Sequence, residues 1–274
     1  MGALIMKPTK QEQEIKNLAT MAQLEQIRAD KELLALKITS GNSKAGTTFG
    51  IDNVRTCPGA TELCKSLCYV NEGAMNFSPA KLMRARNTQA CHNALRKGGP
   101  RLLASLLLAE IDRANVRVIR FHDSGDFFSV PYIQAWIIVV KERPAVTFFG
   151  YTRSWRIPTL RAALLDFAEL ANVKLWLSAD ADCWLAALTE VRKESAWRGL
   201  AFMQTNDSAA NQAIEAILQQ LENRRVINFP AHSKTKAKQA AINPKVTRNC
   251  PAVMGQIKES RSNPACLQCK LCFN

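Results

Sequence analysis

A repeated alternation of apolar runs and helical segments in the middle of the chain most constrains its fold. Five short runs rich in Val, Ile, Leu and Phe recur about every 25 to 30 residues, and a segment with helical periodicity follows each of the first four. The predicted strands are residues 116–121, 146–150, 173–177, 200–203 and 225–229, and the predicted helices are residues 79–97, 101–114, 131–142, 158–171, 183–193 and 209–223. This spacing is that of a strand–helix unit, so successive strands should run parallel.

The repeat predicts an α/β fold, for which a complete or partial TIM-like (β/α) barrel fits best. Residues 47–54 supply a further strand in front of the series. A doubly wound open sheet is the alternative, because the sequence does not give the strand order. We expect an N-terminal helical arm over residues 1–39, a barrel-like domain over 40–230, and a basic, cysteine-rich tail over 231–274 that packs on the barrel. The arm could dock on the body, extend from it, or form a homo-oligomer.

The charge of the chain favours a polyanionic partner. Lys and Arg number 37 against 23 Asp and Glu, which gives a net charge of +14 across 274 residues. Nucleic acid is the usual partner of such a surplus, although some small proteins are simply basic. We see no secretory signal and no apolar run of about 20 residues that could span a membrane. We therefore expect a cytoplasmic protein that does not engage membranes.

Seven of the nine cysteines fall into two groups. The first group is Cys57, Cys64 and Cys68, and the second is Cys250, Cys266, Cys269 and Cys272. The last three follow the C-x2-C-x2-C spacing seen in ferredoxins, whereas structural zinc sites more often pair two separated C-x2-C motifs. In an unsecreted protein, metal ligation is favoured over disulfides. The sequence predicts a 4Fe–4S cluster with ligands drawn from these seven, and it leaves open whether there is one centre or two.

Polar side chains follow the predicted strands, at the edge of a parallel sheet where working residues gather. The candidate catalytic residues are His122, Asp123, Ser124 and Asp126 after one strand, Arg153 after the next and Asp180 after the third. Two carboxylates and an imidazole can bind Mg²⁺ or Mn²⁺, orient water and transfer protons. The same residues also occur as ordinary helix caps and turns.

Aromatic and basic residues suggest contacts with nucleic acid. Tyr151 and Trp155 flank Arg153, so base stacking could accompany a phosphate contact. Lys234, Lys236 and Lys238 form a basic stretch before the tail cysteines, which could hold a phosphate backbone or could be a solvated loop. Because stacking residues accompany the charge, we expect single-stranded DNA or RNA to bind better than duplex.

These motifs together resemble the gene product 88 family of phages and related mobile elements. The resemblance is carried by the following blocks, in chain order: Gly41-Asn-Ser-Lys44; Cys57-Pro-Gly-Ala-Thr with Cys64 and Cys68-Tyr69; Ser124-Gly-Asp-Phe-Phe-Ser129; Phe149-Gly-Tyr-Thr-Arg153-Ser; and the closing Cys250, Cys266, Cys269 and Cys272. It implies a phage, prophage or plasmid origin and little about chemistry.

A looser similarity is to radical SAM enzymes, which place a three-cysteine loop after the first strand of a partial barrel and leave one cluster iron free for SAM. Here the spacing is C-x6-C-x3-C rather than C-x3-C-x2-C, and no Gly-Gly-Glu-like segment is visible.

Three functions follow from these observations. The first is an iron–sulfur nucleic-acid enzyme, a nuclease or nicking enzyme whose cluster is structural. The second is a radical or redox enzyme with an open cluster iron. The third is a nucleic-acid-binding protein whose cluster senses redox state without catalysis.

Overall fold

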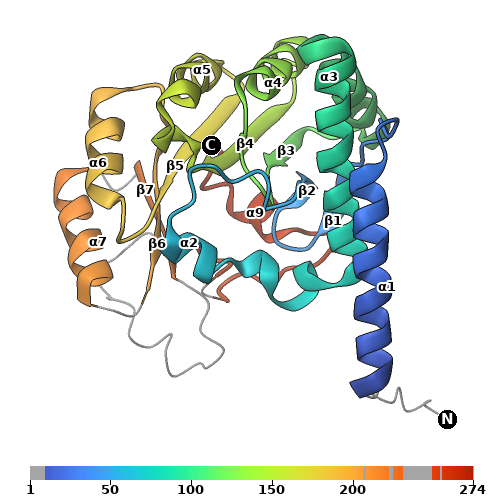
Figure 1. Ribbon diagram of the computed structural model, residues 1–274. Coiled ribbons are helices and arrows are strands. Elements are labelled where there is room, and N and C mark those ends of the chain that lie inside the picture. Colours follow the sequence, from blue (N-terminus) through green and yellow to red (C-terminus); the bar gives the residue numbers. More distant parts are fainter. Residues whose placement is uncertain (1–9, 206–207, 222–224, 231–248, 254, 274) are drawn as a thin grey trace.

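The computed structural model describes residues 10–205, 208–221, 225–230, 249–253 and 255–273. They form an α/β fold around one sheet whose strands lie in sequence order (Figure 1). The strands are β1 (Thr39–Asn42), β2 (Gly46–Phe49), β3 (Val118–Phe121), β4 (Thr147–Thr152), β5 (Val173–Ala179), β6 (Gly199–Gln204) and β7 (Val226–Pro230). β2 to β7 are parallel, and β1 pairs antiparallel with β2. The strand–helix repeat in the sequence is confirmed.

Helices connect the parallel strands and flank them. They are α1 (Lys10–Ala29), α2 (Glu62–Ser66), α3 (Ser78–Ala114), α4 (Val130–Glu142), α5 (Pro158–Ala168), α6 (Trp184–Lys193), α7 (Ser208–Gln220) and α9 (Ala265–Cys269), with short 3-10 helices at Tyr69–Asn71, Gly73–Asn76 and Ser154–Arg156. The two helices predicted between residues 79 and 114 form one element that kinks at Gly98 and Gly99, whose backbone angles are not helical. No helix in the described ranges is both long and apolar enough to cross a membrane.

The sheet is open. β1 and β7 are its two edge strands, and they do not pair with each other in the part of the chain that is described. A complete barrel, which the repeat allowed, is therefore not formed by these residues. The sequential strand order also differs from a doubly wound sheet, in which the order reverses at a switch point.

Alternate side chains of each strand face two different cores. Phe148, Leu175 and Leu177 point into the large core beneath the helices, whereas Phe149 and Trp176 point to the opposite face. That opposite face is covered by the C-terminal tail, whose Phe273 ring lies 4.9 Å from the ring of Phe149. The sheet thus separates a helix layer from the cysteine-rich tail, which Figure 1 shows in red with α9.

The sequence predicted a strand over residues 47–54 but not the hairpin of β1 and β2. Asn42 accepts hydrogen bonds from the backbone N–H groups of Lys44 and Ala45, both at 3.0 Å, and Gly46 adopts a φ of +78°. Gly and Asn, two of the four residues of β1, are disfavoured in strands, so pairing with β2 is what makes this segment a strand.

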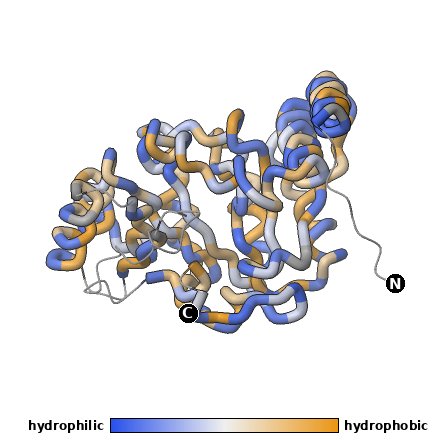
Figure 2. Tube along the Cα trace, turned by 90° about the horizontal axis from the view of Figure 1, so that it is seen from below, coloured by the Kyte–Doolittle hydropathy of each residue, from blue (hydrophilic) through white to orange (hydrophobic). Residues whose placement is uncertain are grey.

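The predicted N-terminal arm is α1, and it packs along α3. Thr20 and Ser78 share a hydrogen bond of 2.8 Å between their hydroxyls, and Ile27 is buried in the contact. Leu18, earlier on the helix, is 67% exposed. Figure 2, which looks along α1, shows this helix at one edge of the molecule and α6 and α7 at the other. Self-association through the arm stays a prediction.

Candidate functional site

A pocket of about 640 Å³ opens at the C-terminal ends of the parallel strands. Its floor includes Arg120, Tyr151 and Phe229, which project from the sheet face opposite the helix layer. All three cysteines of the first group line it, together with the His122–Asp126 turn. A volume in this range suits a small molecule or a single nucleotide unit rather than an extended polymer.

The loop that carries Cys57, Cys64 and Cys68 is held tightly against the strand ends. Thr61 caps α2 by accepting a hydrogen bond from the N–H of Cys64 at 3.0 Å. Gly59 lies against β4 so closely that a Cβ there would be 2.0 Å from the carbonyl oxygen of Arg153. Glycine is therefore required for the loop to reach its position over the pocket.

Burial affects the thiols of Cys57 and Cys64. Desolvation raises the pKa of Cys57 and Cys64, because a thiolate is costly away from water. For Cys57 the neighbouring carboxylate of Asp126 adds to the shift. The Asn53 amide donates to the Sγ of Cys68 at 3.4 Å, a contact of the kind that orients sulfur ligands.

The tail cysteines form a separate group. Cys250, Cys266, Cys269 and Cys272 all line one small cavity of about 10 Å³ between the tail and β7. The backbone fixes two of them, since the N–H of Cys250 donates to Asn228 O at 2.8 Å and that of Cys266 to Lys44 O at 2.7 Å. Tyr151 donates to the Sγ of Cys272 at 2.8 Å, and burial raises the pKa of this thiol to about 12.

Within the described residues, no group of three or more His, Cys, Asp and Glu side chains is arranged to hold a single metal ion. A 4Fe–4S cluster binds each thiolate through a different iron, so its ligands lie farther apart than those of one zinc ion. The seven metal ligands predicted from the sequence therefore stay a prediction. Cys91 and Cys183, which we expected to be buried apolar residues, are buried in the core.

Asp126, a predicted catalytic carboxylate, links the ends of β3 and β4. Its Oδ1 accepts from the Thr152 hydroxyl and from the N–H of Phe127, both at 2.7 Å, while its Oδ2 accepts from the N–H groups of Arg153 at 2.7 Å and Ser154 at 3.1 Å. Desolvation raises its pKa, and these hydrogen bonds oppose that shift. Both oxygens are thus occupied, which is the arrangement of a structural carboxylate.

Asp180 and Arg153 form a buried ion pair instead of standing free at the strand ends. Asp180 is 0% exposed and Arg153 6%, and the Oδ2 of Asp180 accepts from both the guanidinium and the Thr61 hydroxyl. The pair ties β4 and β5 to the cysteine loop. In this arrangement the charge of Arg153 is already neutralised.

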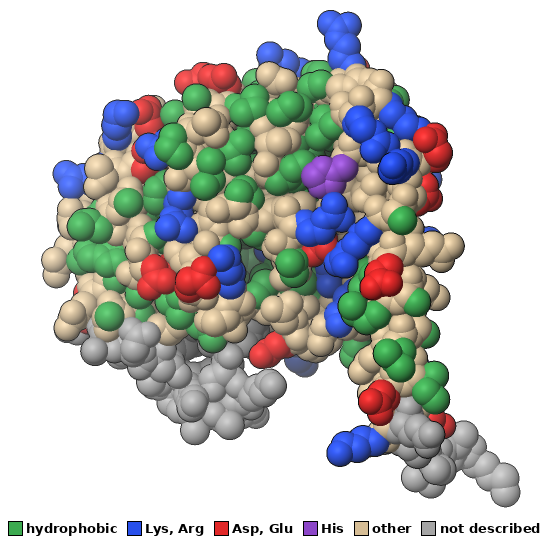
Figure 3. Space-filling model, in the orientation of Figure 1, with side chains coloured by type: hydrophobic (Ala, Val, Ile, Leu, Met, Phe, Trp, Pro, Cys, Tyr) green, Lys and Arg blue, Asp and Glu red, His purple; other side chains and the backbone are tan. Residues whose placement is uncertain are grey.

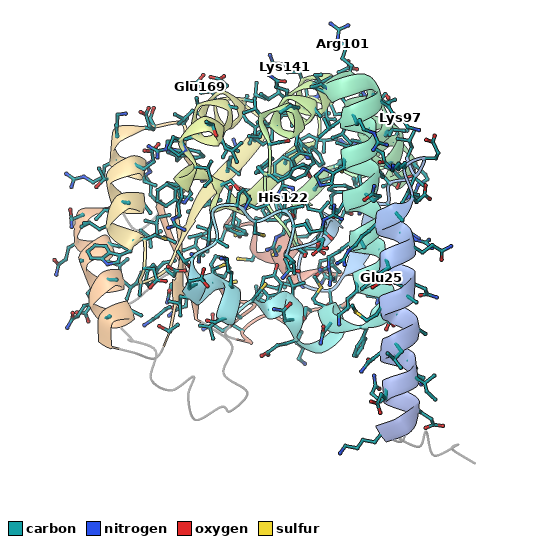
Figure 4. The ribbon with its side chains drawn as sticks, in the orientation of Figure 1. Glu25, Lys97, Arg101, His122, Lys141 and Glu169 are labelled. Carbon is teal, nitrogen blue, oxygen red and sulfur yellow. The ribbon has the colours of Figure 1, made fainter. Side chains whose placement is uncertain are left out.

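His122 lies in an apolar environment that the sequence did not reveal. It is at the centre of the molecule in Figure 4, whereas Arg101, Lys141 and Glu169 project outward. Its Nε2 hydrogen-bonds the Tyr132 hydroxyl at 2.9 Å, and its ring packs edge-on against Phe127. Burial, with a smaller contribution from Arg120, lowers its pKa to about 3. The His122 imidazole is therefore uncharged at neutral pH, because protonating it would place a cation away from water.

We expect this histidine to make stability depend on pH. The unfolded imidazole has a pKa near 6.5, so between pH 6.5 and 3 the unfolded state binds the extra proton. The stability contribution is complete above pH 6.5 and is lost as the pH falls. From pH 6.5 to 5 the loss should be about 1.5–2 kcal/mol, measured by urea unfolding.

In His122→Asn, this part of the pH slope should vanish, and asparagine tolerates the left-handed backbone, φ +44°, at this position. In the control, His92→Asn, the slope due to His122 should remain, and only a smaller part should be lost, because burial also lowers the pKa of His92. An equal slope in wild type and His122→Asn would contradict the assignment.

Asp123 and Ser124 do face the pocket. One oxygen of Asp123, Oδ2, accepts from the Thr48 hydroxyl at 2.7 Å. Its Oδ1 and the hydroxyl of Ser124 are buried and have no hydrogen-bond partner in the described portion of the protein. His122 also lines the pocket, and its Nδ1 likewise has no hydrogen-bond partner among the described residues. Of the predicted catalytic set, these three residues are therefore the ones with polar atoms left for a ligand.

The residues predicted to contact nucleic acid also differ in whether a ligand could reach them. Trp155 is 3% exposed in the helix-side core and donates from its indole to Ser178 O at 3.0 Å, so its ring is not available for base stacking. Tyr151 lines the pocket. Lys234, Lys236 and Lys238 lie outside the described residues.

Sequence reasoning missed Lys44, Arg84 and Arg120, which also line the pocket. Arg120 could have been found, because it interrupts an apolar strand at a position that alternates with Ile119 and Phe121. A charged residue on the covered face of a sheet needs a partner or a function. Arg84 carries no comparable signal, since arginine is common in helices.

Comparisons with known proteins agree with the motif resemblance. A family model described as gene product 88 matches residues 9–274. The Gene 88 protein of Mycobacterium phage L5 is 30% identical over 131 residues, and that of Mycobacterium phage D29 is 29% identical over 131 residues. Each match covers 46% of this chain and 53% of the relative, so the chain spans about half the length of these curated relatives.

No solved structure matches the chain. The family match, by contrast, extends from α1 to the last cysteines and includes both cysteine groups and every strand of the sheet. On this evidence the chain belongs to the gene product 88 family.

Proposed function

We propose that this protein is an iron–sulfur enzyme with two metal centres, of which one faces a substrate pocket. The observation that carries the proposal is the separation of the cysteine groups: three thiols line the 640 Å³ pocket, and four line a different, small cavity. Three thiolates leave one iron of a 4Fe–4S cluster without a protein ligand, whereas four complete the set. This favours the redox alternative over a single structural cluster that joins tail and loop.

The donor sets fit iron–sulfur centres. Sulfur is the only ligand type offered in the tail cavity, and side-chain hydrogen bonds reach Cys68 and Cys272 in the manner that tunes cluster potentials. When bound at the pocket, such a centre supplies one-electron transfer and a Lewis-acidic iron. The open sequential sheet supports the interpretation as a partial barrel, with the pocket at its C-terminal rim.

The pocket residues of the chain would bind and orient the substrate. Asp123 presents an unpartnered carboxylate oxygen and Ser124 a hydroxyl, so each can hold a substrate donor or proton. The tail closes the sheet face and keeps bulk water from it. Asp126 and the Arg153–Asp180 pair keep the strand ends in place around these groups.

Iron analysis tests the metal assignment. Anaerobically prepared protein should contain about eight irons and eight sulfides per chain. Changing Cys57, Cys64 and Cys68 together to Ser should leave about four of each, and so should changing Cys266, Cys269 and Cys272. Cys91→Ala, which removes a core thiol, should leave the metal content unchanged. Stoichiometric zinc, or equal iron in both triple variants and wild type, would overturn the proposal.

The open iron is tested by the EPR spectrum of reduced protein with and without added SAM. The spectrum should change in wild type and in the tail variant but not in the loop variant. If SAM leaves the signal unchanged in all three proteins, the SAM-dependent form of the redox enzyme is excluded.

A nucleic-acid partner is a second candidate, supported by the net charge of +14. On the face in Figure 3, Lys and Arg side chains gather between the centre and α1. If about five phosphates of a single strand are neutralised, log affinity should fall with log salt at a slope near −3.5. Changing Lys234, Lys236 and Lys238 to Ala should reduce that slope by about 2.

The control for this experiment is Lys141→Ala, on the outer face of α4, which should not alter the slope. Salt-independent binding would exclude the partner. Cleavage of the strand with Mg²⁺ or Mn²⁺, lost in Asp123→Asn, would instead establish the hydrolytic alternative.

A further inference from the structure

We infer that Arg84 and Arg120 form a subsite for an oxyanion, so that the molecule bound in the pocket carries a carboxylate or a phosphate group. The inference deepens the proposed function and rests on it only in taking the pocket as the substrate site. Arg84 comes from α3 and Arg120 from β3, and both side chains line the pocket. Neither the strand-end pattern nor the cysteine motifs pointed to these two arginines.

Each of the two guanidinium groups has an N–H donor that lacks a hydrogen-bond partner among the described residues. Arg84 is 4% exposed, and its Nη2 donates to Met75 O at 2.8 Å, which fixes the group in place. Its Nη1 is buried and finds no hydrogen-bond partner among the residues described, and the same holds for the Nε of Arg120. Buried donors without partners are costly, so a site that retains two of them is built for a ligand that accepts hydrogen bonds.

Arg120 is held by stacking instead of by a carboxylate. Its guanidinium carbon lies 5.2 Å from the centroid of the Tyr151 ring. Stacking orients the planar fork while leaving its N–H groups free in the plane. Tyr151 is fixed in turn by its hydrogen bond to Cys272 and its contact with Phe229.

The local charge is positive even with Asp123 present. The Asp123 carboxylate acts electrostatically on both arginines. Its Oδ1 and the stem of Arg84 converge on Gly50, where a Cβ would lie 2.2 Å from Oδ1 and 3.6 Å from Arg84 Cγ. Among the described residues that line the pocket, Arg84, Arg120, Lys44 and Arg261 carry positive charge, against the carboxylates of Asp123 and Asp126. Arg153 contributes nothing, because Asp180 already neutralises it. The surplus suits one anionic group.

Carboxylate and phosphate both accept the paired hydrogen bonds of arginine. The probes that separate them are inorganic phosphate and acetate, each titrated by calorimetry into full-length anaerobic protein of measured iron content. We expect saturable binding of one anion per chain, and the tighter of the two probes identifies the substrate as a phosphate ester or a carboxylic acid.

Arg84→Gln removes the charge and keeps much of the side-chain length. It should weaken binding of the preferred anion about tenfold or more, the scale of one lost charge-assisted hydrogen bond, and Arg84→Lys should fall between. Arg120→Gln is a second, independent test on another element. The matched control is Arg101→Gln, which removes the same charge from the exposed side of α3 and should bind like wild type.

If wild type shows no saturable binding, or if folded Arg84→Gln and Arg120→Gln both bind as wild type does, the subsite is excluded. The outcome is independent of the metal assignment. If the protein binds the anion but contains no iron, the subsite is supported and the proposed iron–sulfur enzyme is excluded. If it contains iron but does not bind the anion, the subsite is excluded and the proposed enzyme is unaffected.

Discussion

Arg153→Met should lower the free energy of unfolding by about 3–5 kcal/mol, because it leaves Asp180 as an uncompensated charge in the core. Asp180 is fully buried, and among the described residues its only cationic partner is Arg153. The Thr61 hydroxyl would remain as a hydrogen-bond donor, but a hydroxyl does not neutralise a carboxylate. Urea unfolding under anaerobic conditions measures the change.

Arg143→Met is the matched control. Arg143 also forms an ion pair, with Asp112 at 2.6 Å, but the two side chains are 30% and 54% exposed, so the loss should be far smaller than in Arg153→Met. The double variant Arg153→Met with Asp180→Leu should regain much of the lost stability, because no buried charge is left unpaired. If Arg153→Met folds as stably as wild type, the ion pair is not structural and Arg153 returns as a candidate for phosphate or substrate contact.

Asp126→Asn should be destabilising by on the order of 3 kcal/mol, since hydrogen bonds to a charged acceptor contribute about 1.5–3 kcal/mol each. The carboxylate accepts four hydrogen bonds, three of them from backbone N–H groups. An amide has one acceptor oxygen, and its NH₂ group would face N–H donors. The damage should spread to the pocket, because β3 and β4 lose their connection at the rim.

Variants of two other aspartates serve as comparisons for Asp126→Asn. Asp166→Asn, on the exposed side of α5, should leave stability unchanged. Asp123→Asn should be milder than Asp126→Asn, since only the Thr48 contact is lost, and its effect should appear in ligand binding. A stable Asp126→Asn protein that lost more than about 100-fold in activity would mean that Asp126 acts in catalysis after all.

Asp123 and Asp126 belong to one sequence motif, yet the motif does not determine the role of each residue. His122, Asp123 and Asp126 stand within five positions of each other at a strand end, and all are buried. The sequence cannot tell which of them turns into the core, which bonds the backbone and which faces the pocket. Those roles depend on Tyr132, on the N–H groups after β4 and on Thr48, which are 10 to 75 residues away in the chain.

The sequence by itself determined most of the helices and strands and the parallel direction of the strands. Apolar strand residues at a regular spacing, with helical segments between them, are local properties of the chain, and they suffice for parallel strands such as β4 and β5. The cysteine spacings likewise mark two groups without knowledge of the fold. The hairpin of β1 is the exception, because its residues become a strand only through pairing with β2.

Only the tertiary structure decided how far the sheet closes, which polar groups are satisfied, and what the two cysteine groups face. The arrangement of Arg84, Arg120 and Tyr151 joins α3, β3 and β4, and no local pattern connects them. The pocket depends on contacts between residues far apart in sequence, whose closeness follows from strand order and packing. Helix and strand periodicity arise from neighbouring residues and can be read directly, whereas a site assembled from several strand ends exists only once the sheet has formed.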